Sequence, residues 1–206
     1  MTSIHITDPN VTTVITPTYV STVKHMVKAG EAINKGQAVY VTGSTGNAGT
    51  NMIVSKASNS IEMTSSKTMG LLESTLALNG QGYVITEGLL AGLDTSAAGA
   101  AGDPVWLGTD GNLIYGLANK PVAPAHLVFI GIVTRKQQNN GEIFVKPQNG
   151  FEVEELHNVV LTSKSTGDML KWNGTQWVNF KGVSGSFTSA DSKTVTVTNG
   201  IITSIS

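Results

Sequence analysis

The sequence predicts an all-β protein whose body is a compact antiparallel β-barrel or sandwich and whose C-terminal region is rich in hairpins. Runs of β-branched and aromatic residues bounded by Gly, Asn or Pro recur along most of the chain, as strands require. The Asn-Gly dipeptides at 140–141, 173–174 and 199–200 have the pattern of tight two-residue hairpin turns. The apolar spacing of three to four residues that marks helices is nearly missing. We therefore expect consecutive strands to pair antiparallel.

Six runs form the main predicted strands. In chain order they are residues 37–43, 82–88, 103–109, 126–136, 141–147 and 194–205. Residues 91–103 are rich in Gly, Ala and Ser, which predicts a flexible surface loop. Two segments carry some helical spacing. Residues 68–78 favour a strand because Gly70 interrupts the pattern, and residues 151–160 predict a helix of at most two or three turns.

The length of the chain predicts one core and an appendage. A protein of 206 residues has room for one good core of about 100 to 150 residues. The density of Gly and Val drops briefly after residue 150, where acidic residues gather. We therefore divide the chain into an N-terminal arm (1–17), a β-rich body (18–150) and a hairpin-containing C-terminal region (151–206).

Composition argues against several classes of partner. The net charge is −1 and Arg135 is the only arginine, so no broad basic field is expected to hold nucleic acid or an anionic membrane. We expect no secretion leader and no membrane insertion, because no stretch approaches the roughly 18 apolar residues of a membrane span. Charged residues make up 13% of the chain, about half the usual share. Such a surface suits either a sturdy extracellular β-protein or a subunit largely buried in an assembly, and composition leaves both open.

The residues that carry chemistry predict no catalytic, cofactor or metal site. The chain has no cysteine, and its four histidines are not spaced as metal ligands. Residues 43–51 have the glycines of a phosphate loop but lack the lysine that would follow them. Gly-x-Ser-x-Gly does not occur, and Glu152, Glu154 and Glu155 are predicted to lie on a solvated face. We therefore expect a protein that is not an enzyme.

The stretch GDMLKWNGTQWVNF (167–180) predicts a hairpin that needs a partner. A two-residue turn at Asn173-Gly174 would place Trp172 opposite Thr175 and Leu170 opposite Trp177. Both faces of this ribbon then carry apolar side chains, and an isolated two-stranded hairpin is marginal in water. Something must therefore cover it.

The closing stretch TVTVTNGIITSI (194–205) predicts a second apolar hairpin. Pairing around Asn199-Gly200 places Val197 opposite Ile202 on one face, with Val195, and leaves Ile201 and Ile205 among threonines on the other. No charge follows Lys193 to protect the edges from aggregation. We expect this hairpin to be packed and not to form a free receptor-binding tip.

Several segments together resemble a β-rich module of tail-fibre and related virion proteins of tailed bacteriophages. They are KAGEAINKGQAVYVTG (28–43), SSKTMGLLE (65–73), GYVITEGLLAGLDTS (82–96), DPVWLGTDGNL (103–113) and HLVFIGIVTRKQQNNGEIFVKPQNGFEVEELHNV (126–159). The segment GDMLKWNGTQWVN resembles a repeat that follows the module in such fibres, and GSFTSADSKTVTVTNGIITSI (185–205) resembles their terminal motif. This chain departs from the pattern in having almost no extension before the module and no long shaft.

The resemblance implies a trimeric, non-enzymatic virion protein that is assembled in the host cytoplasm. Its partners would be two further copies, other virion proteins and, as a candidate, a host surface glycan. We expect a short tail fibre for host attachment; a capsid-decorating head fibre is the first alternative. A carbohydrate-binding module is the second, with Trp106, Trp172 and Trp177 stacking on sugars. The predicted trimer interface is Leu170, Trp172, Trp177, Val178, Phe180, Val197 and Ile202, and the predicted virion-docking residues of the β-competent arm are Ile4, Ile6, Val11 and Val14.

Overall fold

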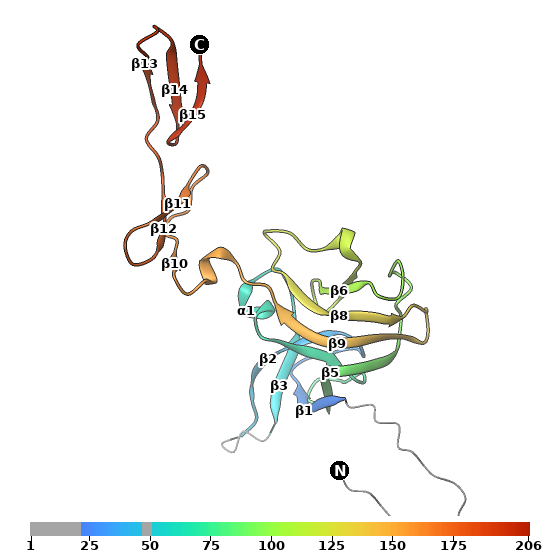
Figure 1. Cartoon of the computed structure of the whole chain (residues 1–206). Helices are drawn as coiled ribbons and strands as arrows, with labels where there is room; N and C mark the ends of the chain where they lie inside the picture. Colours follow the sequence, from blue (N-terminus) through green and yellow to red (C-terminus); the bar gives the residue numbers. More distant parts are fainter. Residues whose placement is uncertain (1–21, 47–50) are drawn as a thin grey trace, which may run out of the picture. The chain divides into compact units, whose positions relative to one another are not determined.

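Strands make up nearly all of the regular secondary structure, as predicted for an all-β chain (Figure 1). The computed structural model describes residues 22–46 and 51–206. The predicted docking residues Ile4, Ile6, Val11 and Val14 lie outside them. The elements, in chain order, are β1 (Val23–Ala29), β2 (Ala38–Ser44), β3 (Met52–Lys56), α1 (Glu62–Ser65), β4 (Thr68–Leu72), β5 (Gln81–Leu93), β6 (Pro104–Leu107), β7 (Leu113–Tyr115), η1 (Leu117–Asn119), β8 (Val128–Arg135), β9 (Gly141–Asn149), η2 (Val153–Glu155), β10 (Val159–Val160), β11 (Met169–Trp172), β12 (Trp177–Phe180), β13 (Gly185–Thr188), β14 (Thr194–Thr198) and β15 (Ile201–Ile205).

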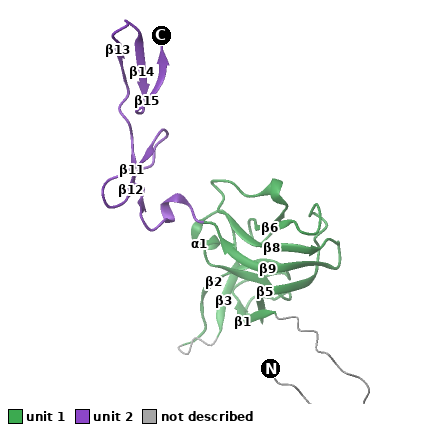
Figure 2. Ribbon diagram, viewed as in Figure 1, with its two compact units in different colours: residues 1–150 green, residues 151–206 purple. Residues whose placement is uncertain are grey.

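Two compact units divide the chain, residues 1–150 and residues 151–206 (Figure 2). In the first unit the strand order is β1-β3-β2-β4-β5-β9-β8-β6-β7. Strand β1 also pairs with the first half of β5, and this pairing closes five strands into a barrel. The second half of β5 continues into a sheet with β9, β8, β6 and β7. The predicted barrel body is therefore confirmed.

The barrel is not wholly antiparallel, which corrects one prediction. Strands β1 and β3 pair parallel, with Val27 opposite Met52, while the other neighbours in the barrel are antiparallel. The reason is arithmetic: five strands in a closed ring cannot alternate in direction at every step, so one neighbouring pair must run the same way. Consecutive hairpin pairing, which the sequence suggested, cannot close this barrel.

Alternation along the barrel strands separates two hydrophobic clusters. Adjacent residues point to opposite sides of a strand, so Leu72 and Val84 belong to one cluster while their neighbours Leu71 and Ile85 belong to the other. The first cluster comprises Val27, Ala29, Ile33, Val39, Val54, Leu72, Leu76 and Val84. The second joins the opposite side of these strands to the β9-β8-β6 sheet, through residues such as Leu90, Val105, Ile130, Ile143 and Val145. One core is therefore shared by the barrel and the second sheet.

Gly131 of β8 is required by close backbone contact, which leads to a stability prediction. A Cβ at this position would lie 2.0 Å from the carbonyl oxygen of Phe144 on β9. We expect Gly131→Ala to lower the free energy of unfolding by about 1–3 kcal/mol, because the strands must separate to admit the methyl group. Gly43→Ala is the matched control, since nothing lies within 4 Å of its Cβ position. Chemical denaturation should show a clear loss only for the first variant; equal stability would contradict the close contact.

The Asn140-Gly141 dipeptide does not form the predicted two-residue turn. Strand β8 ends at Arg135, which pairs with Glu142, so residues 136–140 form a longer loop, and neither Asn140 nor Gly141 has a positive φ. Gly141 instead makes room for Thr95, whose Oγ1 would lie 2.1 Å from a Cβ there. Thr95 is fully buried and its hydroxyl contacts the carbonyl oxygens of Arg135 (2.8 Å) and Gln137 (3.2 Å). The glycine is needed for packing, which a turn motif cannot reveal.

The predicted flexible loop at 91–103 is anchored. Its first residues, 91–93, belong to β5, and Thr95 and Ala98 are buried. The Asp103 carboxylate accepts the backbone N–H of Gly99 at 2.6 Å. The loop is therefore held in place by two buried side chains, of which that of Ala98 belongs to the second hydrophobic cluster.

The helical segments differ from the prediction in detail. Residues 68–72 form strand β4, which confirms the strand preference of the first candidate. The second candidate contains one 3₁₀ turn, η2, in which Glu152 and Glu155 form a capping box. The four-residue helix α1 was not predicted, because it is too short for a repeating pattern and its N-cap residue, Ile61, makes no side-chain cap hydrogen bond.

Candidate self-assembly surface of the C-terminal unit

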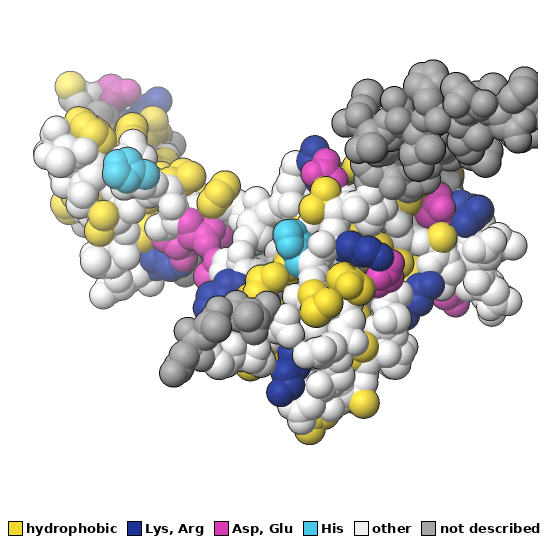
Figure 3. Space-filling model, turned by 90° about the horizontal axis from the view of Figure 1, so that it is seen from below, with side chains coloured by type: hydrophobic (Ala, Val, Ile, Leu, Met, Phe, Trp, Pro, Cys, Tyr) yellow, Lys and Arg dark blue, Asp and Glu magenta, His cyan; other side chains and the backbone are white. Residues whose placement is uncertain are grey.

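The C-terminal unit has two small sheets and very little core. One sheet has the order β10-β12-β11 and the other the order β13-β14-β15. Among its larger apolar residues, Val159 and Val195 are the buried ones, at 7% and 6% exposure. The exposed ones are Phe151, Val153, Leu156, Val160, Leu170, Trp172, Trp177, Phe180, Val183, Phe187, Ile201, Ile202 and Ile205. Figure 3 shows apolar side chains scattered over one face of this unit, among backbone, other side chains and a few charged ones.

The hairpin β11–β12 has a wider turn than predicted. Trp172 pairs with Trp177 and Leu170 with Asn179, so residues 173–176 form a four-residue loop. The side chain of Asn173 causes the difference: its Oδ1 accepts the backbone N–H groups of Thr175 and Gln176, both at 2.9 Å. Gly174 has a positive φ and Asn173 does not, so the two-residue turn is not formed. The predicted pairs Trp172–Thr175 and Leu170–Trp177 are wrong.

The predicted assignment of residues to the two faces of this hairpin is nevertheless correct. The register differs by two residues, and side chains alternate with a period of two, so each residue stays on its side. Leu170, Trp172 and Trp177 share one face, which we call the tryptophan face. The two indoles meet edge to face, with ring centroids 5.8 Å apart and planes at 61°, and they are 46% and 40% exposed.

The opposite face of the hairpin is partly covered within the unit. The Lys171 ammonium lies 5.0 Å from the centroid of the Phe180 ring. The Met169 methyl lies 3.2 Å from where a Cβ of Gly200 would be, so it packs on the turn between β14 and β15. Val178 pairs with Val160 of the parallel strand β10. The tryptophan face is therefore the more open side of the hairpin.

Asn179 ties the loop at 161–168 to the hairpin. Its amide exchanges hydrogen bonds with the backbone of Thr162, donating to the carbonyl at 2.8 Å and accepting the N–H at 2.9 Å. It also donates to the Asp168 carboxylate at 2.8 Å, which accepts the N–H of Ser165 as well. These hydrogen bonds hold the pKa of Asp168 below its ordinary value of 3.8, and the one from Asn179 has the largest effect.

A substitution at Asn179 should therefore move the titration of Asp168. We expect Asn179→Ala to raise the pKa of Asp168, whereas Gln176→Ala, in the hairpin loop, should leave it unchanged. Because the folded pKa is lowered, the carboxylate stabilises the unit above its unfolded pKa, and this contribution disappears as the pH falls through the folded pKa. Carboxyl ¹³C NMR titration measures both values. An unchanged pKa in Asn179→Ala would show that the amide does not act on the carboxylate.

The closing sheet is amphipathic, and this corrects the predicted faces of its last hairpin. Asn199 and Gly200 both have positive φ, and Val197 pairs with Ile202 as predicted. A bulge between Thr196 and Val197 then inserts one extra residue in β15, so Ile205 pairs with Val195 and joins the apolar face instead of the threonine face. The apolar face contains Phe187, Val195, Val197, Ile202 and Ile205, and the other face carries Ser186, Thr188, Thr194, Thr196, Thr198 and Ser204, with Ile201 at its end.

The turn of the closing hairpin is docked inside the unit. The N–H of Gly200 donates to the carbonyl oxygen of Val183 at 3.0 Å, and the N–H of Asn199 donates to Ser184 Oγ at 2.9 Å. A Cβ on Gly167 or Gly182 would lie 2.2 Å from Asn199 atoms. Glycines are needed at both positions because the turn presses on this backbone.

The structure thus groups the predicted interface residues into three places. Leu170, Trp172 and Trp177 lie on the tryptophan face, Val178 and Phe180 on the other side of that hairpin, and Val197 and Ile202 on the apolar face of the closing sheet. Sequence reasoning missed Phe187 and Ile205. The strand β13 that carries Phe187 was not recognised, although the alternation in GSFT was a signal, and Ile205 depends on a bulge that no local pattern announces.

A shallow hollow on the body contains a tyrosine and an aspartate. Its lining includes Lys35, Asp94, Asn112 and Tyr115. The Tyr115 hydroxyl donates to the carbonyl oxygen of Asp94 at 3.3 Å, and burial, with Asp94 nearby, raises the pKa of Tyr115 to about 12. The Asp94 carboxylate accepts Ser96 Oγ (2.6 Å) and the Ser96 N–H (2.9 Å), which lowers its pKa. Tyr115 therefore stays protonated and Asp94 ionised at neutral pH, and each already has a partner.

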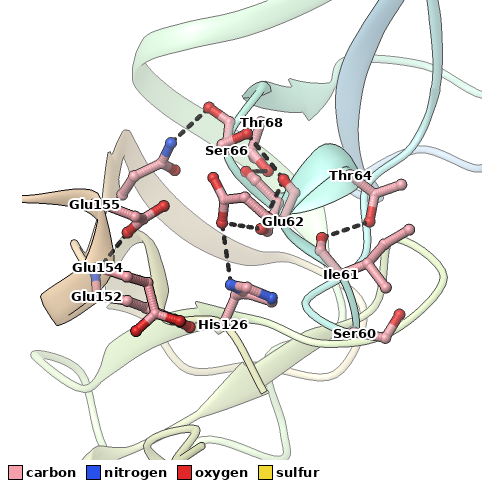
Figure 4. A network of polar contacts seen from close by, with 12 residues as sticks. Ser60, Ile61, Glu62, Thr64, Ser66, Thr68, His126, Glu152, Glu154 and Glu155 are labelled. Atoms are coloured by element: carbon pink, nitrogen blue, oxygen red, sulfur yellow. Dashed lines mark hydrogen bonds and ion pairs between the residues drawn. The ribbon is translucent and has the colours of Figure 1, made fainter. Parts of the chain in front are cut away.

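A polar network holds the short helix α1 against the body (Figure 4). His126 Nδ1 lies 3.0 Å from Glu62 Oε2, and the hydroxyl of Ser66 donates to the Glu62 carbonyl at 2.8 Å. The Thr68 hydroxyl donates to the Ser65 carbonyl at 2.6 Å.

Trp106 has a structural role in the body. It is 9% exposed, its Nε1 donates to the Gly116 carbonyl at 3.0 Å, and its ring packs edge-on against Phe129. Trp106 therefore offers no stacking platform for a sugar.

Residues 22–46 and 51–206 contain neither a candidate metal site nor a candidate membrane-spanning helix. No group of three or more His, Cys, Asp or Glu residues there could hold a metal ion. No helix among these residues is long and apolar enough to cross a membrane.

Comparison with solved structures finds a similarity in fold, whereas the other two comparisons find none. No family model matches the chain, and no curated protein matches it. Among solved structures, the chain is similar to the N base of the head fiber protein gp8.5 of bacteriophage phi29, with 13% sequence identity and a TM-score of 0.39. The match covers 64% of this chain and 99% of that chain. At this TM-score we infer nothing from it about the role of this protein.

Proposed function

We propose that the protein is a structural component of a bacteriophage particle, a short fibre that assembles from three copies through its C-terminal unit. Self-assembly is supported by the lack of a hydrophobic core in that unit. Of its larger apolar residues, only Val159 and Val195 are buried. Small domains need a core, a metal or disulfides to fold alone, and this chain has no cysteine. Further copies would supply the missing burial.

The sequence resemblance supports the phage assignment and the number three. It covers the body, the hairpin repeat and the terminal motif in the order found in fibres, which is more specific than any one motif. The nearly uncharged C-terminal strands fit the same role, since charges close to a symmetry axis would repel their own copies. A head position is the alternative within this class, and labelled antibodies on intact particles would distinguish it from a tail position.

The exposed tryptophans also suit a sugar-binding site, but their geometry favours assembly. A stacking platform presents an indole face to the ring of the sugar, whereas here the two planes are inclined at 61° and each ring covers part of the other. Glycan binding by the intact protein with no self-association would favour the sugar-binding function.

Sedimentation of the full chain and of a chain ending after Gly150 tests the proposal. At micromolar concentration the full chain should have a molecular mass in solution of three times the 21.5 kDa of one copy. The truncated chain should fold cooperatively, because both hydrophobic clusters lie between residues 27 and 145, and should lose most of its self-association. A monomeric full chain would overturn the proposal, and a trimeric truncated chain would move the assembly surface to the body.

A further inference from the structure

The closing sheet has two open edges. Strands β13 and β15 are its outer strands, and all of their residues are exposed. Their outward N–H and C=O groups have no hydrogen-bond partner in the part of the chain that the structure describes. Natural proteins protect such edges with charges, proline or a covering segment. GSFT and IITSI contain neither charge nor proline, so these edges are suited to pairing.

The apolar face of this sheet runs from one edge to the other. Phe187 on β13 pairs with Val195 on β14, which pairs with Ile205 on β15. The side chains at the two edges are the most exposed, Phe187 at 57% and Ile205 at 61%. The uncovered apolar surface is therefore greatest where a neighbouring strand would lie.

We propose that β15 of one copy pairs with β13 of the next copy, in a head-to-tail contact that repeats until the sheets close into a ring with their apolar faces inward. The inference rests on the proposed function, because it uses self-assembly and specifies its surface. Both strands run antiparallel to β14, so they are parallel to each other. A rotation about an axis along the strands places β15 beside β13 in parallel orientation, and one contact type satisfies every edge.

A second copy of this chain is the occupant that the observations favour. The two edges have nearly equal lengths, four and five residues. Neither strand carries a charge that would repel its own copy. A foreign strand on one edge would leave the other edge open, and a two-fold pairing of β15 with β15 would leave β13 unpaired. The ring pairs both edges and covers the apolar face at once.

Engineered cysteines test this contact, because the chain has no cysteine of its own. Ser186 and Ser204 both pair with Thr196, on β13 and β15, so they lie at the same height on the hydroxyl face. Two strand spacings, about 9.5 Å, separate them within one chain, which is too far for a disulfide. In the double variant Ser186→Cys, Ser204→Cys, mild oxidation should link neighbouring copies into covalent trimers. A second double variant, Thr188→Cys with Ser204→Cys, should form the disulfide instead if β13 and β15 of neighbouring copies pair in a register shifted by two residues.

The single variants Ser186→Cys and Ser204→Cys are the matched controls, and neither should form disulfide-linked oligomers on oxidation. Mixing the Ser186→Cys and Ser204→Cys chains before assembly should give linked pairs that contain one of each. Covalent dimers of Ser204→Cys alone would show two-fold edge pairing and overturn the proposal. A trimeric wild-type chain without links in either double variant would overturn the edge contact but not the proposed function. A monomeric wild-type chain would overturn both.

Discussion

A chain with Val197→Asp and Ile202→Asp is expected to be monomeric at concentrations where the wild-type chain is trimeric. The two residues pair directly on the apolar face of the closing sheet. If this face is buried between copies, each carboxylate loses its water without gaining a partner, at a cost of several kcal/mol. Each 1.4 kcal/mol is a factor of ten in an association constant, so the loss should exceed a hundredfold. Sedimentation equilibrium measures it directly.

The control for this variant places the same charges on the other face of the same sheet. Thr196 and Ser204 are also a directly opposed pair on β14 and β15, and they belong to the hydroxyl face. Thr196→Asp with Ser204→Asp should therefore weaken assembly much less than the first variant, because its carboxylates keep their water, while both variants place one charge on the edge strand β15. If both variants assemble, the apolar face is exposed in the particle and is free to bind something else. If neither assembles, the sheet tolerates no charge pair and its faces are not distinguished.

Removal of both indoles, Trp172→Ala with Trp177→Ala, should weaken self-association by roughly a hundredfold or more. Burial of a large apolar side chain contributes about 1.5–3 kcal/mol, and two are removed from each copy. The indoles also contact each other, so the double variant avoids leaving one unpaired ring. The folding of the body should not change, because Trp106 and the two hydrophobic clusters lie in the first unit.

Thr175→Ala is the control for the tryptophan variant. Thr175 lies in the hairpin loop, and its backbone N–H, which the substitution keeps, makes the hydrogen bond to Asn173. Sedimentation of both variants, with a glycan-array measurement on the same samples, separates the two roles of the indoles. Trimers that lose only glycan binding would identify a sugar site, and unchanged trimers without any glycan binding would show that the tryptophan face is not part of the interface.

Local sequence patterns determined several of the longer strands and the faces of the hairpin at 167–180. β-branched runs predicted strands at β2, β5, β8, β9 and β14, because that preference comes from each residue and its neighbours. Asn199-Gly200 predicted its turn, since positive φ at both positions is a local property. The faces of the hairpin at 167–180 were correct despite a wrong register, because a shift of two residues preserves alternation.

Only the tertiary structure decided how the strands meet. Closure of an odd number of strands requires the parallel pair β1–β3, and neither strand contains information about that closure. Gly141 resembles a turn residue in the sequence, but it is needed because the buried Thr95, 46 positions earlier, occupies the space of its side chain. In the closing sheet, one extra residue moves Ile205 to the apolar face. Each of these outcomes depends on contacts between segments distant in sequence or on the fit between strands, and such contacts are settled by packing of the whole fold and not by local preference.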